Sequence, residues 1–434
     1  MKILHTADLH LGQIIYQNYE RGDEHRHFFA QLKEWCKNEK PDALLVSGDV
    51  FDIQQPSAAT KKAFTEYFAD LHGYCPDMHI VITAGNHDSA SRIQADSAVW
   101  EYANTNLVGV SPAVDAGDDC LDKYIVRLQT GYIVAMPYMI GERKGQLQSI
   151  LDRIAAENTE AKPVVMMGHT AVDGLDPAGH TFDIGTLKVQ DTASFGTGFD
   201  YLALGHIHKP QTIGHKQDAM NDEVMYQSPV IRYSGSVLHV SCDEAYPHTV
   251  SLVEIDRRGG NVKIKQLRID ELRHFYVLPE EGKAFVSADE ALNAISQFVS
   301  NNKSGYIRLR IDSKVDLPPN FSQMIYDILS TTKDEVRYNP SILWEGKDDD
   351  SQKVREKPKF GVVDLQEMKD PLDFIKKTID QYQNIDINEL EQAFAEVRDE
   401  IQRINEEEQI SKASKKKTKA SVADKEINQT VEEL

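Results

Sequence analysis

Long hydrophobic runs and paired cysteines are both scarce in this sequence, and each absence excludes a class of protein. The four cysteines lie far apart and form no CxxC pair, so they predict neither a disulfide framework nor a thiolate zinc site. No apolar stretch approaches the roughly 18 residues of a membrane span. The N-terminal run is short and interrupted by His5 and Asp8, unlike a signal peptide. We therefore expect no membrane association and a cytoplasmic location.

Positive charge is also in short supply. The chain has 48 Lys and Arg against 69 Asp and Glu, a net charge of −21 over 434 residues. A chain this acidic cannot bind nucleic acid through its overall field, so such binding would need a local basic surface, a metal site or a partner. Its length and its 41% hydrophobic residues predict roughly two or three domains with real cores.

An α/β domain is predicted for residues 1–271. Short apolar runs rich in Val, Ile and Leu alternate with helix-compatible segments, a pattern typical of strands in an α/β sheet. The runs span 2–9, 43–50, 79–87, 131–138, 164–169, 201–206 and 230–236. Residues 57–71 predict a helix that opens at Ser57. Two alternating segments around Arg-Arg-Gly-Gly predict a hairpin over 249–269 that closes the domain.

Four further regions are expected after this domain. Residues 272–344 predict a small α+β capping domain around the alternating strand 305–313, and 345–360 a polar linker. Residues 361–410 show the apolar spacing of two amphipathic helices, and 411–434 the composition of a disordered charged tail. The apolar positions predicted to bind a partner are Leu365, Met368, Leu372, Phe374, Leu390 and Phe394.

Polar residues that could carry chemistry follow the apolar runs. They are Asp8, His10, Asp49, Asn86, His87, Asp88, His169, His206 and His208. Ligands of open α/β sheets bind beyond the carboxyl ends of the strands, so these residues should converge on one site. A single His at such a place is more often an ordinary loop residue, and Asp49 alone could be a helix N-cap. Their shared location at five strand ends favours a site.

The donor set indicates a pair of metal ions. Carboxylates, imidazoles and one amide oxygen, without sulfur, suit two divalent ions such as Mn, Fe or Zn better than magnesium alone. Asp49, on the second run, is the natural bridging ligand. Two ions about 3.5–4 Å apart can share a hydroxide and neutralise a phosphoryl group, which the slow hydrolysis of phosphate esters requires.

Taken together and in order, five motifs resemble the complete signature of the calcineurin-like metallophosphoesterases. They are DLH (8–10), GD (48–49), GNHD (85–88), GH (168–169) and GHIH (205–208). The resemblance implies a two-sheet sandwich flanked by helices. Within that family, HTADLHLGQ, GDVFD, YLALGHIHKPQ and YSGS are similar to the SbcD-type nuclease subunits of SbcC–SbcD exonucleases, over about residues 1–275.

The resemblance implies a role for each matched residue. Asp8, His10 and His208 would hold one Mn²⁺ ion, Asn86, His169 and His206 the other, and Asp49 would bridge them. His87 would be catalytic, stabilising the phosphate or protonating the leaving oxygen. Asp52 stands where archaeal and eukaryotic relatives carry a His, so it cannot take that imidazole's role; we expect it to orient a metal-bound His.

The same resemblance implies a substrate and partners. It implies 3′-to-5′ exonuclease action on double-stranded DNA and endonuclease action on single strands, in DNA repair, recombination and replication. The helical pair would grip an SbcC-type, SMC-like ATPase subunit, although from the residues alone it could fold back on its own domain. A homodimer would use helix 57–72 and the helix after Asp88, whose apolar stripe could equally be core.

Three basic residues could contact the substrate. Arg92, just after GNHD, is a candidate phosphate contact, with a solvent-exposed helix residue as the equal alternative. Arg308 and Arg310 could meet a DNA backbone, but a solvated strand face explains such a pair more often. Two other functions stay open for the chain: a stand-alone metallophosphoesterase acting on a small phosphodiester or a phosphoprotein, and a non-catalytic scaffold that tethers DNA ends.

Overall fold

The computed structural model places residues Met1–Gly346 in one compact unit. The structure describes residues 1–16, 19–113, 118–139, 144–176, 189–215, 223–240, 244, 246–301, 304–332 and 335–346. The predicted helical pair and tail, with Leu365, Met368, Leu372, Phe374, Leu390 and Phe394, lie outside the described residues, as does nearly all of the predicted linker. These assignments and the proposed domain limits stay predictions.

The described residues form a seven-stranded first sheet in the order β12-β15-β14-β1-β4-β5-β6. β1, β4, β5 and β6 run parallel, while β14 pairs antiparallel with β1 and with β15, which confirms the predicted hairpin. All five residues of β4 are buried, because a strand covered on both faces can be apolar throughout. The bounds are β1 Lys2–Thr6, β4 Ala43–Ser47, β5 His79–Thr83, β6 Thr105–Val108, β12 Glu223–Gln227, β14 Thr249–Ile255 and β15 Asn261–Arg268.

A six-stranded second sheet, in the order β11-β13-β10-β9-β8-β7, packs face to face on the first. Ile3, Leu45 and Val81 of the first sheet share one buried core with Val165 and Leu202 of the second. This packing confirms the expected two-sheet sandwich. The bounds are β7 Ile125–Arg127, β8 Tyr132–Ala135, β9 Val164–His169, β10 Tyr201–Gly205, β11 Gln211–Thr212 and β13 Val230–Tyr233.

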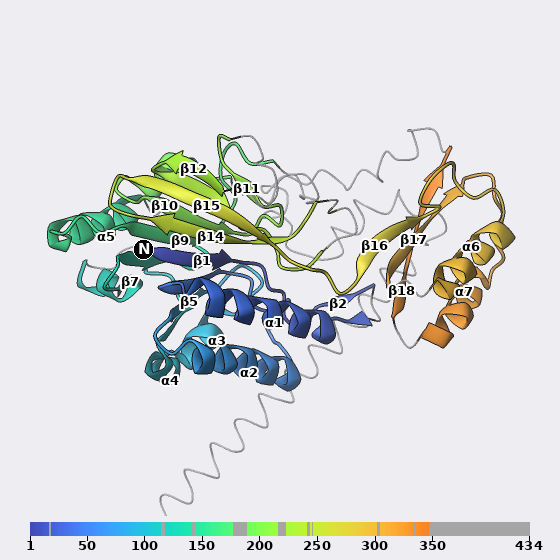
Figure 1. The fold of residues 1–434 in the computed structure, drawn as a ribbon, viewed down its shortest axis with the longest axis horizontal. Helices are drawn as coiled ribbons and strands as arrows, with labels where there is room; N and C mark the ends of the chain where they lie inside the picture. Colours follow the sequence, from blue (N-terminus) through green and yellow to red (C-terminus); the bar gives the residue numbers. More distant parts are fainter. Residues whose placement is uncertain are drawn as a thin grey trace, which may run out of the picture. The chain divides into compact units, whose positions relative to one another are not determined.

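Helices cover the outer faces of the sandwich. α1 (Gly22–Glu39) and α2 (Ala58–Tyr74) lie side by side along the first sheet, where Phe28 and Phe68 pack against Leu44 (Figure 1). α2 begins where predicted, because the Ser57 hydroxyl caps it by accepting from the Thr60 amide at 3.1 Å. α5 (Lys144–Glu157) packs its apolar residues into the core of the second sheet.

A smaller subdomain has its own core. Three parallel strands, β16 (His274–Leu278), β17 (Gly305–Asp312) and β18 (Val336–Glu345), carry α6 (Ala288–Ser300) and α7 (Phe321–Leu329) on one face (Figure 1). β17 lies where the alternating strand was predicted. β16 and β18 were not predicted, because β16 is short and β18 contains Pro340, which argues against a strand.

Short elements complete the described residues. The two-stranded pair β2 (Ile14–Ile15) and β3 (Tyr19–Glu20) follows the first strand of the chain, and α3 (Ala90–Ala95) and α4 (Ser97–Trp100) follow β5. α3 and α4 stand where a single helix was expected after Asp88. None of the helices in the described part of the chain is long and apolar enough to cross a membrane.

Candidate metal centre

Five loops from the two sheets meet at the carboxyl ends of the parallel strands. β1, β4 and β5 run parallel in one sheet and β9 and β10 in the other, so their carboxyl ends can converge as predicted. The predicted strands were too long, however. β1 ends at Thr6, β4 at Ser47 and β5 at Thr83, so most of the predicted ligands lie in the loops beyond the strands.

The backbone of these loops is held in an unusual conformation. Asp8, His10, Asp49 and His206 have φ values of 52°, 45°, 47° and 93°, a region that residues other than glycine rarely occupy. Each such residue costs on the order of 1–3 kcal/mol unless its surroundings impose it. Here the first two loops brace each other, because the amides of Asp8 and His10 donate to the carbonyls of Gly48 and Asp49, both at 3.0 Å. This backbone conformation directs the side chains toward the centre.

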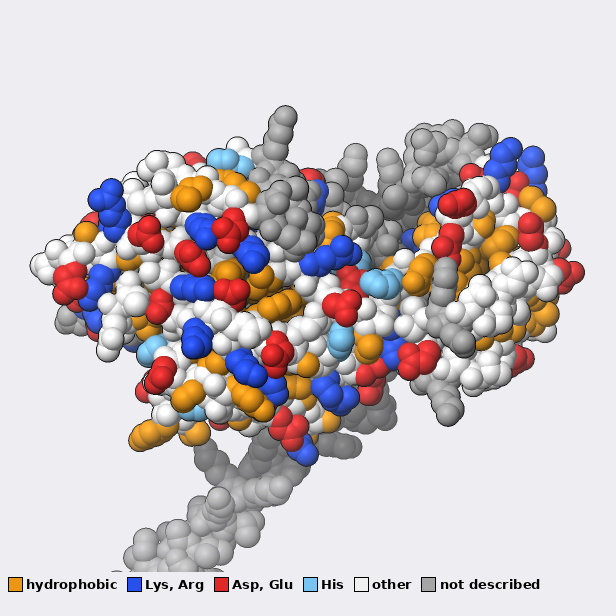
Figure 2. Space-filling model, viewed as in Figure 1, with side chains coloured by type: hydrophobic (Ala, Val, Ile, Leu, Met, Phe, Trp, Pro, Cys, Tyr) orange, Lys and Arg blue, Asp and Glu red, His pale blue; other side chains and the backbone are white. Residues whose placement is uncertain are grey.

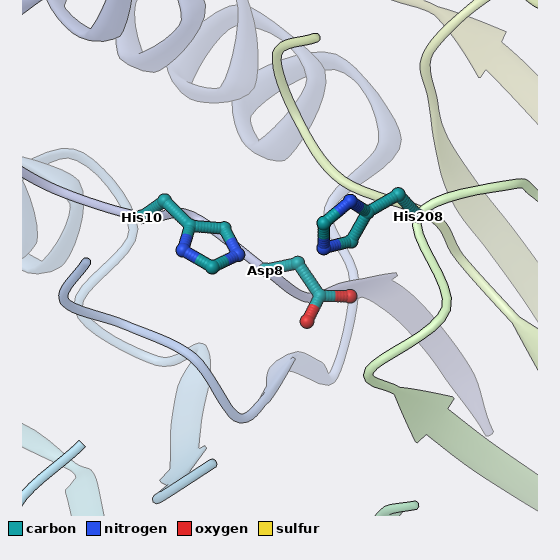
Figure 3. A group of neighbouring side chains, drawn as sticks. All are labelled: Asp8, His10 and His208. Carbon is teal, nitrogen blue, oxygen red and sulfur yellow. The ribbon is translucent and has the colours of Figure 1, made fainter. Parts of the chain in front are cut away.

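One group of possible ligands consists of Asp8, His10 and His208. Their ligand atoms lie within 4.8 Å of one another, and all three residues are buried. Figure 3 shows the two imidazoles pointing toward each other beside the Asp8 carboxylate. His208 Nδ1 lies 2.9 Å from Glu244 Oε1, so this nitrogen donates and Nε2 is left as the metal-binding atom.

His10 shows that this group fits a metal ion. Its ring is 2% exposed, and neither ring nitrogen has a hydrogen-bond partner among the described residues, an arrangement that burial makes costly. Asp52 Oδ1 lies 3.3 Å from Nδ1, which orients the ring and leaves Nε2 facing the centre. An ion at Nε2 would satisfy this nitrogen.

The second group consists of Asp49, His169 and His206, with Asn86 beside them. His169 Nδ1 donates to the Ser47 carbonyl at 2.8 Å, which leaves Nε2 facing Asp49 Oδ2 at 3.3 Å and Asn86 Oδ1 at 3.0 Å. The Asn86 oxygen also lies 2.9 Å from His206 Nδ1. Nitrogen and oxygen atoms that face one another in this way are arranged as the ligands of a bound cation would be.

Asp49 lies between the two groups. Its Oδ2 atom is 3.3 Å from His169 Nε2 and 3.9 Å from His10 Nε2. The carboxylate is 2% exposed. This is the placement that a ligand shared by two ions requires.

The electrostatics of the cluster favour positive charge at its centre. Burial raises the pKa of Asp8 to about 6, although His169 opposes the shift. Burial works against a protonated His169, yet the carboxylates of Asp49 and Asp8 raise its pKa to about 9. Without metal, protons therefore supply the compensating charge that divalent ions supply when bound.

Two glycines of the motifs are required by close approach. A Cβ at Gly48 would collide with the ring of His169, and one at Gly85 with the carboxylate of Asp49. Gly48 also has a φ of 83°, which glycine adopts without strain. The GD and GNHD motifs therefore include these glycines for space as well as for the turn.

His87 stands apart from the ligands because its side chain is exposed. Its amide donates to Asp49 Oδ1 at 2.8 Å, and its Nδ1 lies 2.8 Å from the Asp52 carbonyl, which leaves Nε2 free to face a substrate. The ring centroid is 5.0 Å from that of His10. Asn86 and His87 both lie in a bend after β5.

Comparison with known proteins agrees with this geometry. Residues 1–210 match the family model described as calcineurin-like phosphoesterase. The SbcD subunit of the SbcCD nuclease from Rhodobacter capsulatus is 31% identical over 316 residues, which cover 65% of this chain and 73% of that protein. The chain belongs to the SbcD family of calcineurin-like phosphoesterases.

Other members of the family are similar along different lengths. The SbcD protein of Escherichia coli K12 is 28% identical over 58% of this chain and 65% of its own length. That of Staphylococcus saprophyticus is 28% identical over 80% of this chain and 88% of its own length. The latter match extends well beyond the residues that carry the five motifs, so the likeness to the family includes more than the metal centre.

Two residues of the centre had no predicted role. The buried Asp88 carboxylate accepts from the amides of Gly85, Val50 and Phe51 at 2.8–3.0 Å, which ties the GNHD loop to the GD loop. Its place in the GNHD motif was the available signal. Glu244, which orients His208, lies 36 residues away in the chain and belongs to no motif, so no sequence pattern pointed to it.

The basic residues predicted to contact the substrate lie outside the metal centre. Arg92 is exposed and lines a surface pocket with Lys61 and Trp100, so a role in binding phosphate stays a prediction. Arg308 instead donates from Nε to the Ser341 carbonyl at 2.8 Å, which links β17 to β18. This contact gives Arg308 a role within its own sheet.

Proposed function

We propose that this chain is a nuclease subunit that hydrolyses DNA phosphodiester bonds at the metal centre. The observation that carries the proposal is the convergence of two ligand groups on Asp49, at 3.3 Å from His169 and 3.9 Å from His10. Membership of the calcineurin-like phosphoesterases supports ester hydrolysis, and relatives named nuclease support DNA as the substrate. We infer exonuclease action from 3′ to 5′ on duplexes and endonuclease action on single strands.

Each side chain has a distinct part in this proposal. Asp8, His10 and His208 would hold one ion, Asn86, His169 and His206 the other, and Asp49 both. When bound, two divalent ions, Mn²⁺ in our proposal, polarise the phosphate and supply a nucleophilic hydroxide. The carboxylate of Asp52 keeps the His10 ring turned so that Nε2 faces the centre.

His87 would act on the substrate rather than on the ions. Its Nδ1 is held by the Asp52 carbonyl, so a proton on Nε2 points out of the buried cluster, where a leaving oxygen or a phosphate oxygen can accept it. The exposure of this ring, next to buried ligands, supports the assignment.

The charge of the chain indicates that DNA would be bound at a local site and with a contribution from a partner protein. The net charge of −21 repels a polyanion, and Figure 2 shows acidic and basic side chains interspersed over the face viewed. We propose that the metal centre and an SbcC-type ATPase, bound by the helices predicted for residues 361–410, supply the binding that the overall field cannot.

A homodimer is part of the same proposal. Phe64, Phe68 and Leu71 of α2 belong to the core of their own subunit, whereas Val99 and Tyr102 are 72% and 95% exposed. The segment around these two residues is thus the better candidate for self-association. The variant Tyr102→Ser should lower the mass measured by light scattering from a dimer to a monomer; an unchanged mass would remove this surface from the proposal.

The proposed function is tested by digesting end-labelled duplex DNA with Mn²⁺, with and without the ATPase subunit. We expect products shortened from the 3′ end, with faster digestion in the complex. Cleavage of a small aryl phosphodiester without any cleavage of DNA would favour a stand-alone phosphoesterase. Cleavage of neither substrate, with metal bound, would indicate a scaffold.

A further inference from the structure

A second cluster of metal-ligating side chains lies outside the catalytic centre. His239, His248 and Glu271 each place one ligand atom within 4.8 Å of the others. They come from the loop after β13, the residue before β14 and the segment between β15 and β16. The five family motifs include none of the three.

His248 provides the observation that points to an ion. Its side chain is fully buried, and its Nδ1 donates to the Ser236 carbonyl at 2.8 Å, so Nε2 carries a lone pair. Nε2 has no hydrogen-bond partner among the described residues and lies 3.5 Å from Glu244 Oε2. A lone pair that faces a carboxylate oxygen in a buried site is unfavourable unless a cation lies near both.

The two imidazoles are suited to ligate. His248 is fully buried and the His239 side chain is 12% exposed, an environment that favours the neutral form of both rings. The ring centroids are 4.2 Å apart. Neutral imidazoles in contact, unlike imidazolium ions, leave nitrogen lone pairs for a metal.

The surrounding charges balance those of a divalent cation. Glu244 and Glu271 contribute two carboxylates. The guanidinium of Arg21 donates to the His239 carbonyl but is paired with Glu24 at 3.0 Å, and the charge of Arg268 also acts on Glu271. His274 faces Glu271 at 3.2 Å from the exposed side. A divalent cation bound at this position would balance the charge of the two carboxylates.

We propose that His239, His248 and Glu271 bind a third ion, zinc, at the junction between the sandwich and the smaller subdomain. Zinc takes imidazole and carboxylate ligands at about 2.0–2.2 Å, which sets ligand atoms a little over 3 Å apart. His239 Nδ1 and Glu271 Oε2 are 3.5 Å apart, so little movement is needed. Glu244 Oε2 is within reach as a fourth ligand.

Such an ion would fix the connection between the two parts. Glu271 lies in the short segment between β15 and β16, and the Ile269 amide at its start donates to the His248 carbonyl at 3.0 Å. Glu244 touches both clusters, since its other oxygen orients His208. The zinc site is independent of the proposed nuclease function.

Native mass spectrometry of the full chain, loaded with Mn²⁺ and one equivalent of Zn²⁺ and then desalted, tests the proposal. We expect three ions per chain, one of them zinc. Glu271→Gln preserves shape but removes the charge, and His248→Gln removes the buried ligand; each should lose one ion. His215→Gln, which changes an exposed histidine outside the cluster, is the matched control and should keep three.

A catalytic-centre variant separates this site from the proposed function. Asp49→Asn should lose catalytic ions yet keep the zinc, whereas Glu271→Gln should keep two ions. A zinc-edge anomalous peak beside His248 in wild-type crystals would support the site even if a variant folds poorly. Two ions in the wild type, or three in folded Glu271→Gln, would overturn the proposal.

Discussion

A substitution at His87 can separate metal binding from catalysis most clearly. Its amide donates to Asp49, whereas its exposed ring contacts the Asp52 carbonyl and the ring of His10. His87→Asn should keep both ions and slow hydrolysis by about 10²–10⁴-fold, the usual contribution of a general acid. Metal content and turnover are measured on the same preparation. Unchanged turnover would refute the role.

Asp52 should tune metal affinity through His10. Its carboxylate lies 3.3 Å from His10 Nδ1, and groups that orient a ligand in this way contribute about 10–100-fold to metal affinity. Asp52→Asn should therefore weaken Mn²⁺ binding by about that factor in isothermal titration. Because the Asp52 carbonyl is kept, His87 should stay in place. Equal affinities would show that the contact does not orient the ligand.

The candidate ligands were predicted from their shared location and the order of the motifs, but their backbone conformation was not. Chain order and residue type in DLH, GD, GNHD, GH and GHIH indicated seven ligands, and the structure brings these side chains together. The positive φ of Asp8, His10 and Asp49 left no trace in the sequence, because strain of this kind is imposed by neighbouring loops. The role of Glu244 was not predicted either, because it depends on a tertiary contact alone.

Among the helices and strands, the N-terminus of α1 joins the smaller subdomain to the sandwich. Asp23 and Glu24, in its first turn, suit the helix dipole. Glu24 accepts from Tyr306 of β17 at 2.6 Å and pairs with Arg21 at 3.0 Å and with Arg337 at 3.3 Å. The strands of the smaller subdomain are thereby tied to a helix of the phosphoesterase sandwich.

Breaking this network should loosen the subdomain. Arg337→Gln leaves the buried Glu24 with one cation fewer, and removal of one partner from a buried pair costs about 3–5 kcal/mol. We expect a loss in the lower part of that range in urea unfolding, because Arg21 remains. Lys283→Gln, which changes a charge on the exposed surface, is the control. A loss no greater than that of the control would contradict the account.

The Glu24 carboxylate predicts that the stability of the fold depends on pH. Burial opposes ionisation of Glu24, but Arg21, Tyr306 and Arg337 lower its pKa below the ordinary 4.5. A carboxyl whose folded pKa is depressed stabilises the fold above its unfolded pKa, and that stability is lost as the pH falls below it. Unfolding free energy should therefore decline below pH 4.5, less steeply in Glu24→Gln. Identical slopes would exclude this carboxylate as the cause.

β16 and β18 show why some elements could not be predicted. β18 contains Pro340 and follows no apolar alternation, yet it pairs with β17 around a bulge between Arg308 and Arg310. Its pairing depends on the long parallel contact with β17, which local pattern does not encode. The central strands β1, β4, β5, β8, β9, β10 and β13 were predicted because they are buried and largely apolar, whereas the edge strands β6, β7, β11 and β12 were not.

Across the chain, we propose that residues 361–410 bind the ATPase subunit. Two amphipathic helices predicted there cannot bury their apolar faces alone. Deletion of residues 361–405 should abolish co-purification with the ATPase subunit and spare phosphodiesterase activity with Mn²⁺. The matched control removes 411–434, the predicted tail, and should keep both. Co-purification after the first deletion would refute the assignment.

The dinuclear centre is examined most directly by anomalous scattering from crystals grown with Mn²⁺. We expect two manganese peaks about 3.5–4 Å apart, one beside Asp8, His10 and His208 and the other beside His169 and His206, with Asp49 between them. A single peak, or two peaks that do not share Asp49, would contradict a two-metal phosphodiesterase.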